Sequence, residues 1–292
     1  MDMFKFRRNQ KVFDIGRVKV GGQPGENPTV LVGSIFYHGH KIVVDEKTGK
    51  FRKEEAEKLI KLQEEFSEKT GNPSMLDVVG STKEAMVKFI DFVANVTEAP
   101  IMIDSPSVEV KVAGVKYASE VGLENRVVYN SLIPESKPEE FEALKDSRVK
   151  SAVLLAYKKG VMTSRARVEA LKELLLKAEE AGVVKPLLDT FVIDIPSLSM
   201  ACRAMLDLKR ELGFPCGCGA HNAISTWVGL KERMGGQAVK SCTIAVNIAP
   251  IVLGADFILY GPIEDCEYVF PAVFTINTSY TYLNKRKEQT EF

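Results

Sequence analysis

The 292-residue sequence lacks the features that mark several large classes of protein. It has only five cysteines, an odd number without scaffold spacing, which argues against a secreted fold held by disulfides. It has no excess of either charge, because Lys plus Arg and Asp plus Glu each total 39. Formal neutrality argues against a nucleic-acid partner held mainly by phosphate neutralisation. These absences favour a protein of the reducing cytoplasm that binds no nucleic acid.

An uninterrupted hydrophobic run of membrane length is also missing. The longest apolar stretch, residues 242–260, is broken by Asn247, Pro250, Gly254 and Asp256. A membrane span would not carry these interruptions, and no basic-then-apolar signal sequence opens the chain. We therefore expect a soluble protein that does not insert into a membrane.

What the sequence does contain is a hydrophobic share of 45% and a charged share of 27%, which suits a large core under a well-solvated surface. Short apolar runs alternate with amphipathic stretches from about residue 30 onwards. Eight runs lack a clean two-residue alternation, as expected for parallel strands that are covered on both faces. These predicted strands are residues 30–35, 74–79, 100–104, 126–130, 151–156, 186–191, 214–219 and 256–259.

The stretches between the runs have helical periodicity, clearest over residues 53–69, 165–181 and 197–212. Ser81-Thr-Lys-Glu84 predicts a capping box, and Gly182 and Gly213 stand where two of the helices should end. Strict alternation of strand and helix implies a parallel sheet with right-handed crossovers. Eight such units close a barrel, whereas an open doubly wound sheet usually has fewer, so we predict a (β/α)8 TIM barrel.

The two ends of the chain are expected to add little to this barrel. Residues 12–15 and 18–20 predict a short β-hairpin within an N-terminal segment, 1–29, which should cover the amino-terminal mouth of the barrel. A helix is expected after Cys266, followed by a polar tail over residues 284–292. No linker or low-complexity segment interrupts the chain, so residues 1–292 are predicted to form one TIM-barrel domain.

Polar side chains stand where five of the strands end. They are Asp77, Asp104, Asn130, Asp189 and, just beyond the seventh strand, Asn222. Any one of them could simply cap the next helix or begin a turn. In a barrel, however, the five converge on one cavity at the carboxyl ends of the strands. Carboxylates accept paired N–H bonds and carboxamides both donate and accept, which suits a flat nitrogen heterocycle better than a metal ion.

Several motifs resemble the H-subunit family of tetrahydromethanopterin S-methyltransferase. They are Gly21-Gly-Gln-Pro-Gly25, Gly33-Ser-Ile-Phe-Tyr-His-Gly-His40, Leu76-Asp-Val-Val-Gly80, Ile103-Asp-Ser105, Tyr129-Asn-Ser131, Cys218-Gly-Ala-His-Asn222 and Leu259-Tyr-Gly-Pro262. The resemblance covers essentially the whole chain. It implies a pterin-binding barrel similar to dihydropteroate synthase.

The resemblance also implies an activity. Members of this family and their soluble relatives move a methyl group between a corrinoid protein and N5 of a tetrahydropterin, either tetrahydrofolate or tetrahydromethanopterin. It implies that Asp104, Asn130 and Asp189 bind the pyrimidine edge of the pterin and that Asn222 lies near N5. The corrinoid (cobalamin) would be carried by a partner protein. Tetrahydrofolate is the favoured pterin, because the soluble relatives use it, and a homodimer is expected.

The expected chemistry asks for positioning rather than covalent work. A methyl group on N5 can leave only when N5 is protonated or polarised. The Asn222 amide suits this role because it can act as donor or acceptor as N5 gains or loses its proton. Asn222 and Asp77 are therefore the candidate catalytic residues, with Asp77 assisting a water that carries the proton.

Two alternatives remain open at this point. His38, His40, Cys216, Cys218 and His221 could supply ligands for a zinc-dependent methyltransferase or hydrolase, although Cys-x-Cys is not the usual zinc spacing and we expect no metal. The chain could also be a subunit that works only within a larger methyltransferase complex. The apolar run at residues 269–274 offers a surface that a second copy would cover, unless the run packs on the barrel as its last helix.

Overall fold

Eight parallel strands close into a barrel in the computed structural model, which describes residues 5–160 and 163–285. The strands follow one another round the barrel in chain order, and the last pairs with the first. The predicted TIM barrel is therefore confirmed. The strands are β3 (Val30–Ile35), β6 (Ser74–Val79), β7 (Ile101–Asp104), β8 (Val127–Leu132), β9 (Ser151–Leu155), β10 (Lys185–Asp189), β11 (Cys216–Cys218) and β12 (Phe257–Pro262).

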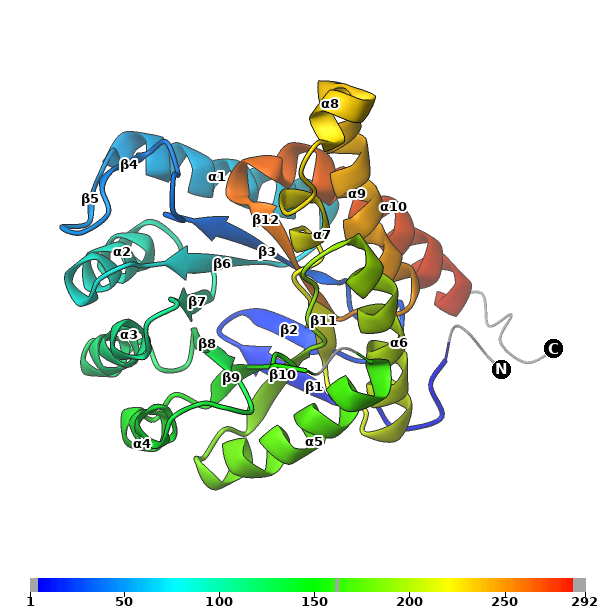
Figure 1. Ribbon diagram of the computed structural model, residues 1–292, viewed down its shortest axis with the longest axis horizontal. Coiled ribbons are helices and arrows are strands. Elements are labelled where there is room, and N and C mark those ends of the chain that lie inside the picture. The colour runs from blue at the N-terminus through cyan, green and yellow to red at the C-terminus, as the bar shows by residue number, and fades with distance from the viewer. Residues whose placement is uncertain (1–4, 161–162, 286–292) are drawn as a thin grey trace.

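A ring of helices surrounds these strands (Figure 1). The ring consists of α1 (Lys53–Thr70), α2 (Lys83–Val96), α3 (Val108–Glu120), α4 (Pro138–Ser147), α5 (Ser164–Glu180), α6 (Ile195–Glu211), α9 (Gly236–Val252) and α10 (Cys266–Lys285). Smaller elements that the sequence pattern did not reveal are β4 (Val43–Asp45), β5 (Lys50–Phe51), α7 (Asn222–Ser225), α8 (Leu230–Met234) and η1 (Ile263–Asp265). Most of these lie in loops that follow the carboxyl ends of strands, where a TIM barrel usually carries its site.

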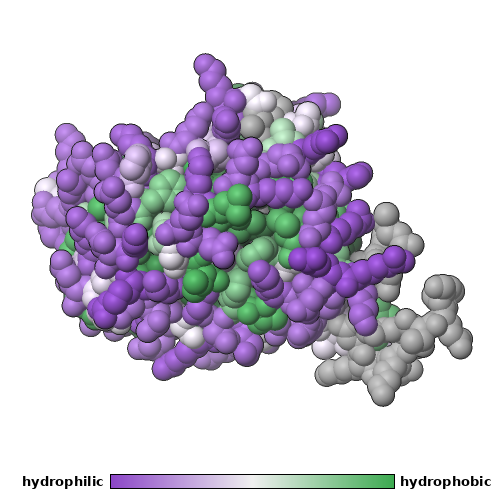
Figure 2. Space-filling view, turned by 90° about the horizontal axis from the view of Figure 1, so that it is seen from below, coloured by the Kyte–Doolittle hydropathy of each residue, from purple (hydrophilic) through white to green (hydrophobic). Residues whose placement is uncertain are grey.

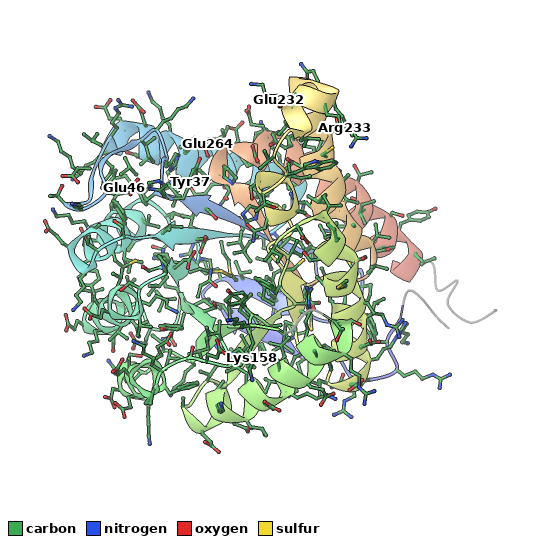
Figure 3. All side chains as sticks on the ribbon, in the orientation of Figure 1. Tyr37, Glu46, Lys158, Glu232, Arg233 and Glu264 are labelled. Atoms are coloured by element: carbon green, nitrogen blue, oxygen red, sulfur yellow. The ribbon has the colours of Figure 1, made fainter. Side chains whose placement is uncertain are left out.

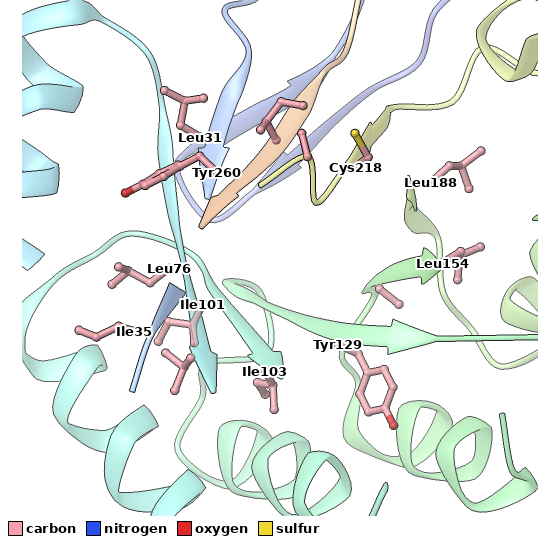
Figure 4. Packing of buried hydrophobic residues seen from close by; sticks show 14 of the residues in the cluster. Leu31, Ile35, Leu76, Ile101, Ile103, Tyr129, Leu154, Leu188, Cys218 and Tyr260 are labelled. Atoms are coloured by element: carbon pink, nitrogen blue, oxygen red, sulfur yellow. The ribbon is translucent and has the colours of Figure 1, made fainter. Parts of the chain in front are cut away.

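The strand side chains alternate between two hydrophobic layers. Residues such as Leu31, Leu76 and Leu154 point outward and join the helices in one large cluster, as Figure 4 shows. Their neighbours along the strands point inward and fill the barrel with a second cluster: Val30, Val32, Met75, Met102, Val128, Val153, Leu187, Phe257 and Leu259. Both layers are apolar, which explains why the sequence shows no alternation between polar and apolar residues along the strands.

The N-terminal hairpin closes one end of the barrel. It consists of β1 (Val12–Ile15) and β2 (Val18–Gly21), paired antiparallel. Ile15, Val18 and Val20 are buried and belong to the same cluster as the inward-facing strand residues. The predicted hairpin is therefore present, and the opposite end of the barrel remains open for a site.

Some local predictions need correction. The N-cap of α2 is Thr82, whose side chain accepts a hydrogen bond from the Ala85 amide at 3.1 Å. Ser81 instead donates its hydroxyl to the Glu46 carbonyl, so the capping box predicted at Ser81 and Glu84 does not form. The cap moves by one residue because Ser81 is engaged by the β4–β5 loop. Gly182 and Gly213 do take the left-handed conformation expected after α5 and α6.

The apolar run near the C-terminus is largely covered by the barrel itself. Val269, Phe270 and Val273 on α10 are buried, while Phe274 is 43% exposed. The expectation that this run forms an open apolar surface is therefore wrong, because one face of α10 packs on the strands and on α1. Helix α10 ends at Lys285, and the rest of the expected polar tail, residues 286–292, lies outside the described residues.

The rest of the surface fits the composition. Seen from below, it is mainly hydrophilic, with small hydrophobic areas near the centre of the face (Figure 2). Within residues 5–160 and 163–285, no helix is both long and apolar enough to cross a bilayer. All five cysteines are unpaired, as the absence of scaffold spacing predicted.

Candidate functional site

A cavity of about 480 Å³ lies at the carboxyl ends of the strands. Seven strands contribute to its wall the residue two positions beyond an inward-facing residue of the barrel core, and Gly219, directly after β11, is the eighth. These eight wall positions are Ser34, Asp77, Asp104, Asn130, Leu155, Asp189, Gly219 and Gly261. Because side chains alternate along a strand, the same parity that fills the core with apolar groups directs these wall residues, five of them polar, into the cavity.

All five residues singled out from the sequence line this cavity: Asp77, Asp104, Asn130, Asp189 and Asn222. The first four are among the eight wall positions, and Asn222 begins the short helix α7 that follows β11. The pocket has the size of a small-molecule site. The structure thus brings the candidates together, while the role of each one as a ligand remains a prediction.

Asp77 is held by hydrogen bonds on both carboxyl oxygens. The Ser34 hydroxyl donates to Oδ2 at 2.8 Å, and the Asn130 amide donates to Oδ1 at 3.0 Å. Burial raises the pKa of Asp77 to about 6, although both hydrogen bonds act in the opposite direction. The contact uses Nδ2 of Asn130, so its Oδ1 is left to accept a hydrogen bond from a ligand.

Asp104 stands beside Asp77 at the end of the neighbouring strand. Burial and the charge of Asp77 raise the pKa of Asp104 well above its ordinary value. The cation of Lys111 on α3 opposes this only partly. Two adjacent buried carboxyls that disfavour each other's charge can hold a proton at neutral pH.

A buried cluster behind this acid pair fixes the backbone of β8. Lys111 donates to the Ser131 carbonyl at 2.7 Å and to Glu140 at 3.0 Å, and the Tyr129 hydroxyl donates to the same Glu140 oxygen at 2.6 Å. Ser131 follows Asn130 directly and also lines the cavity. The cluster therefore holds the segment that presents the Asn130 amide.

Asp189 lies at the end of β10. Its Oδ1 accepts a hydrogen bond from the Phe191 amide at 2.7 Å. Burial raises the pKa of Asp189 to about 7, against that hydrogen bond and the nearby cation of Arg167. Arg167 is fully buried and donates to the carbonyls of Thr190 and Phe191, which fixes the loop that follows the strand.

The side of the cavity after β11 carries no acid. Here Gly219 and Gly261 leave room, and His221 and Asn222 occupy it. The Nδ1 of His221 lies 3.0 Å from the Leu259 carbonyl, which requires a proton on Nδ1. Burial lowers the pKa of His221, so the imidazole is neutral at pH 7. The cavity thus has an acidic half and a neutral half.

The rim of the cavity carries aromatic side chains. Tyr37 stacks on His40 with ring centroids 4.4 Å apart, and His40 Nε2 lies 2.9 Å from Glu264. Figure 3 shows Tyr37 and Glu264 together where β3 ends. Tyr157 and Phe191 form a second aromatic pair at 4.8 Å. These rings can pack against the faces or the tail of a flat ligand.

The zinc ligands considered from the sequence are not gathered into one group. His38 is exposed and pairs with Glu46, and His40 is engaged by Phe36 and Glu264. Cys218 points into the outer hydrophobic cluster, away from the cavity (Figure 4). In the part of the chain that the structure describes, no three His, Cys, Asp or Glu side chains are placed to hold a metal ion. The proposed zinc site therefore lacks its ligand set.

Comparison with known proteins identifies the family. The family model for the tetrahydromethanopterin S-methyltransferase MtrH subunit matches residues 8–292. The chain belongs to this family. The MtrH protein of Methanothermobacter thermautotrophicus, from its tetrahydromethanopterin S-methyltransferase, is 42% identical over 281 residues, which cover 92% of this chain and 91% of the relative. The corresponding chain of a putative mtx methyltransferase of Methanosarcina acetivorans is 40% identical, covering 92% and 90%.

Membership of the MtrH family makes this chain a methyltransferase. Among solved structures, dihydropteroate synthase of Yersinia pestis with a pterine–sulfa conjugate matches with a TM-score of 0.68. That match has 12% sequence identity and covers 94% of this chain and all of the other. At this identity the likeness concerns the fold alone, and it agrees with the TIM barrel described above.

Other wall residues of the site were not identified from the sequence. Ser34 and Gly261 lie within motifs that carry the family resemblance, and Leu155 lies in none of them. Their place in the cavity wall becomes visible only when the parity of each strand is known. His221 was considered only as a zinc ligand, and Phe191 not at all. The signal for Ser34 was its place two residues after the inward-facing Val32, which requires the barrel register to be known.

Proposed function

We propose that this MtrH-family methyltransferase moves a methyl group between a corrinoid protein and N5 of a tetrahydropterin bound in the cavity. The observation that carries the proposal is the acidic half of the cavity. Asp104 and Asp189 end β7 and β10, Asn130 lies near the end of β8, and all three line one cavity of about 480 Å³. A pyrimidine edge with several N–H donors matches such a wall.

The raised pKa values of the acids suit this ligand. Without ligand, a proton on a buried carboxyl avoids the cost of an unpaired charge. When the N–H groups of a pterin donate to Asp189 or Asp104, the ionised form becomes the favoured one and a proton is released. A carboxyl that keeps its proton can instead donate to a carbonyl oxygen of the ring. One wall can therefore satisfy both the donors and the acceptor of the pterin edge.

The neutral half of the cavity is the proposed place of reaction. Asn222 stands at the start of α7, directly after β11, and would contact N5. Its amide can donate to an unprotonated N5 or accept from a protonated one. The corrinoid would supply or receive the methyl group through the open mouth of the cavity, carried there by a separate protein. The relatives are each named as one subunit of a methyltransferase, which supports an assembly with other chains.

Calorimetric titration with tetrahydrofolate and with tetrahydromethanopterin tests the pterin assignment. We expect one pterin per chain in metal-free buffer. Asp104→Ala should weaken binding by about 2–3 kcal/mol, because it removes a buried charge-assisted hydrogen bond. Asp146→Ala, which changes an exposed acid on α4, is the matched control and should leave binding unchanged. If neither pterin binds, the proposed function is wrong.

The choice between the two pterins rests on the tail, since they share the ring. The sequence favours tetrahydrofolate by analogy with soluble relatives, whereas a relative at 42% identity is named for tetrahydromethanopterin. We keep tetrahydrofolate as the expected ligand and test it by competition. Tighter binding of tetrahydromethanopterin would reverse this choice and leave the methyl-transfer proposal intact.

A further inference from the structure

We propose that His221 is the base that takes the proton from N5 when the pterin receives its methyl group. The inference rests on the proposed function and deepens it, because Asn222 can contact N5 but cannot hold an extra proton. His221 precedes Asn222 in the chain, and both line the neutral half of the cavity. It is the one histidine of the sequence whose side chain lines this cavity.

The imidazole is held in the form that can accept a proton. Its Nδ1–H donates to the Leu259 carbonyl at 3.0 Å, which leaves the lone pair on Nε2. Within residues 5–160 and 163–285, Nε2 has no hydrogen-bond partner, and it is not among the polar atoms sealed away from solvent. It therefore opens onto the cavity. A Cβ built on Gly261 would lie 3.1 Å from the His221 ring, so the glycine makes room for the imidazole.

The surroundings keep this base neutral until it is used. Burial lowers the pKa of His221, and the hydrogen bond to Leu259 opposes this only in part. The ionisable groups that share the cavity are Asp77, Asp104 and Asp189 on the acidic half and Tyr37 at the rim.

The elements packed against His221 add few charges. On the adjoining β12, Tyr260 is turned outward and donates to Gln63. Beyond β12, in η1, Glu264 is engaged by His40, and Asp265 interacts with Lys240 and Tyr268. The rest of α7 has no ionisable side chain.

Asp77 is less suited to this step than the sequence suggested. Both of its oxygens already accept hydrogen bonds, from Ser34 and Asn130. It also stands on β6, three strands round the barrel from β11, where Asn222 follows. Asp77 thus orients the Asn130 amide, while His221 is adjacent to the proposed reacting atom.

The step balances without another reactant. The N5 lone pair forms a bond to the methyl carbon of a methylcorrinoid, and the electrons of the broken bond stay on the corrinoid. N5 then carries both a hydrogen and the methyl group with a positive charge. Its N–H bond breaks, the electron pair returns to N5, and the proton moves to Nε2 of His221. Solvent at the open mouth takes the proton from the imidazolium afterwards.

Single-turnover methyl transfer to the pterin over a range of pH is the first test. It is measured at saturating pterin, so that titration of the acids that affect binding does not enter. The wild-type rate should fall as the pH drops below the pKa of His221, which lies under 6.5. His221→Gln should no longer show this fall in rate at low pH. Its rate should be about 10²-fold lower than that of the wild type, with little change in pterin affinity. His38→Gln, at an exposed histidine, should match the wild type.

Nuclear magnetic resonance of the histidine rings provides a test that needs no turnover. The sequence has three histidines, so each ring signal can be assigned from one substitution. Saturating tetrahydrofolate or tetrahydromethanopterin should shift the titration of His221 and leave that of His38 unchanged. If a pterin binds but the titration of His221 does not shift, the inference is wrong and the proposed function stands. The same holds if His221→Gln keeps the wild-type rate and the same fall in rate at low pH. If no pterin binds to the wild type, both are wrong.

Discussion

At the scale of single residues, the site contains side chains that lower the folding stability of the protein when no ligand is bound. Asp77, Asp104 and Asp189 are buried, and burial raises the pKa of each. A buried carboxyl whose pKa is raised in this way favours its protonated form in the folded state. Stability contributed by that form is lost as the pH rises from the ordinary pKa through the folded pKa. The acids that would hold a ligand therefore cost stability at neutral pH.

Asp189→Asn should show this cost directly. The pKa of Asp189 is raised from 3.8 to about 7, so between these values the folded state binds more protons than the unfolded one. Asn keeps an oxygen for the Phe191 amide but does not titrate. The difference in unfolding free energy, variant minus wild type, should therefore rise by roughly 2–4 kcal/mol from pH 4.5 to pH 8. Urea titrations at the two pH values measure it, with Asp146→Asn as the exposed control.

Asn222→Ala should separate chemistry from binding. A contact made chiefly in the transition state lowers kcat, whereas a uniform binding contact changes mainly KM. We expect a loss of about 10²–10³ in the rate of methyl transfer with much less change in pterin affinity. Asp104→Ala should show the opposite bias. Single-turnover methyl transfer beside equilibrium binding gives both values, and near-normal turnover of Asn222→Ala would place N5 elsewhere.

At the scale of elements, sequence patterns located the strands well and their side-chain directions poorly. The strands at Val30–Ile35 and Ser74–Val79 have the predicted bounds, because each is a continuous apolar run. The run at 214–219 shortens to β11 (Cys216–Cys218). Five site residues could be found because each is a polar residue within, at the end of or shortly after such a run. Ser34 and Gly261 could not, since inward parity depends on the register with neighbouring strands.

The loop elements were beyond the sequence pattern for a related reason. β4, β5, α7 and α8 contain two to five residues each, too few for a periodicity to appear. The cap of α2 shifted from Ser81 to Thr82 because Ser81 is bound by the β4–β5 loop, a contact between residues 35 apart. Tertiary contacts of this kind override local signals.

The hairpin β1–β2 should stabilise the barrel without affecting the site. Ile15 is fully buried in the inner cluster at the end opposite the cavity. Ile15→Ala should cost about 2–4 kcal/mol in unfolding free energy, through lost burial and a residual cavity. Pterin affinity of the folded variant should equal that of the wild type. Val12→Ala, at a residue 37% exposed, serves as control and should cost little. An affinity loss in Ile15→Ala would mean that the two ends of the barrel are coupled.

At the scale of the whole molecule, the number of copies in solution remains a prediction. The resemblance to pterin-binding barrels favours a homodimer, but the run at 269–274 no longer supports it, since Val269, Phe270 and Val273 pack inward. Sedimentation equilibrium at micromolar concentration should give a mass near twice 32.3 kDa. A mass of one chain would contradict the dimer.

The two glycines of the cavity wall leave space for the side chains of Asn222 and His221. A Cβ on Gly219 would lie 3.2 Å from the Asn222 amide, and one on Gly261 would lie 3.1 Å from His221. A single added methyl at either place would displace the side chain that stands there. The ring of eight wall positions is thus lopsided, with bulk and charge on one arc and, on the other, glycines that leave room for His221 and Asn222. A flat molecule held along the acidic arc would have its far edge, and any group transferred to or from that edge, beside His221 and Asn222.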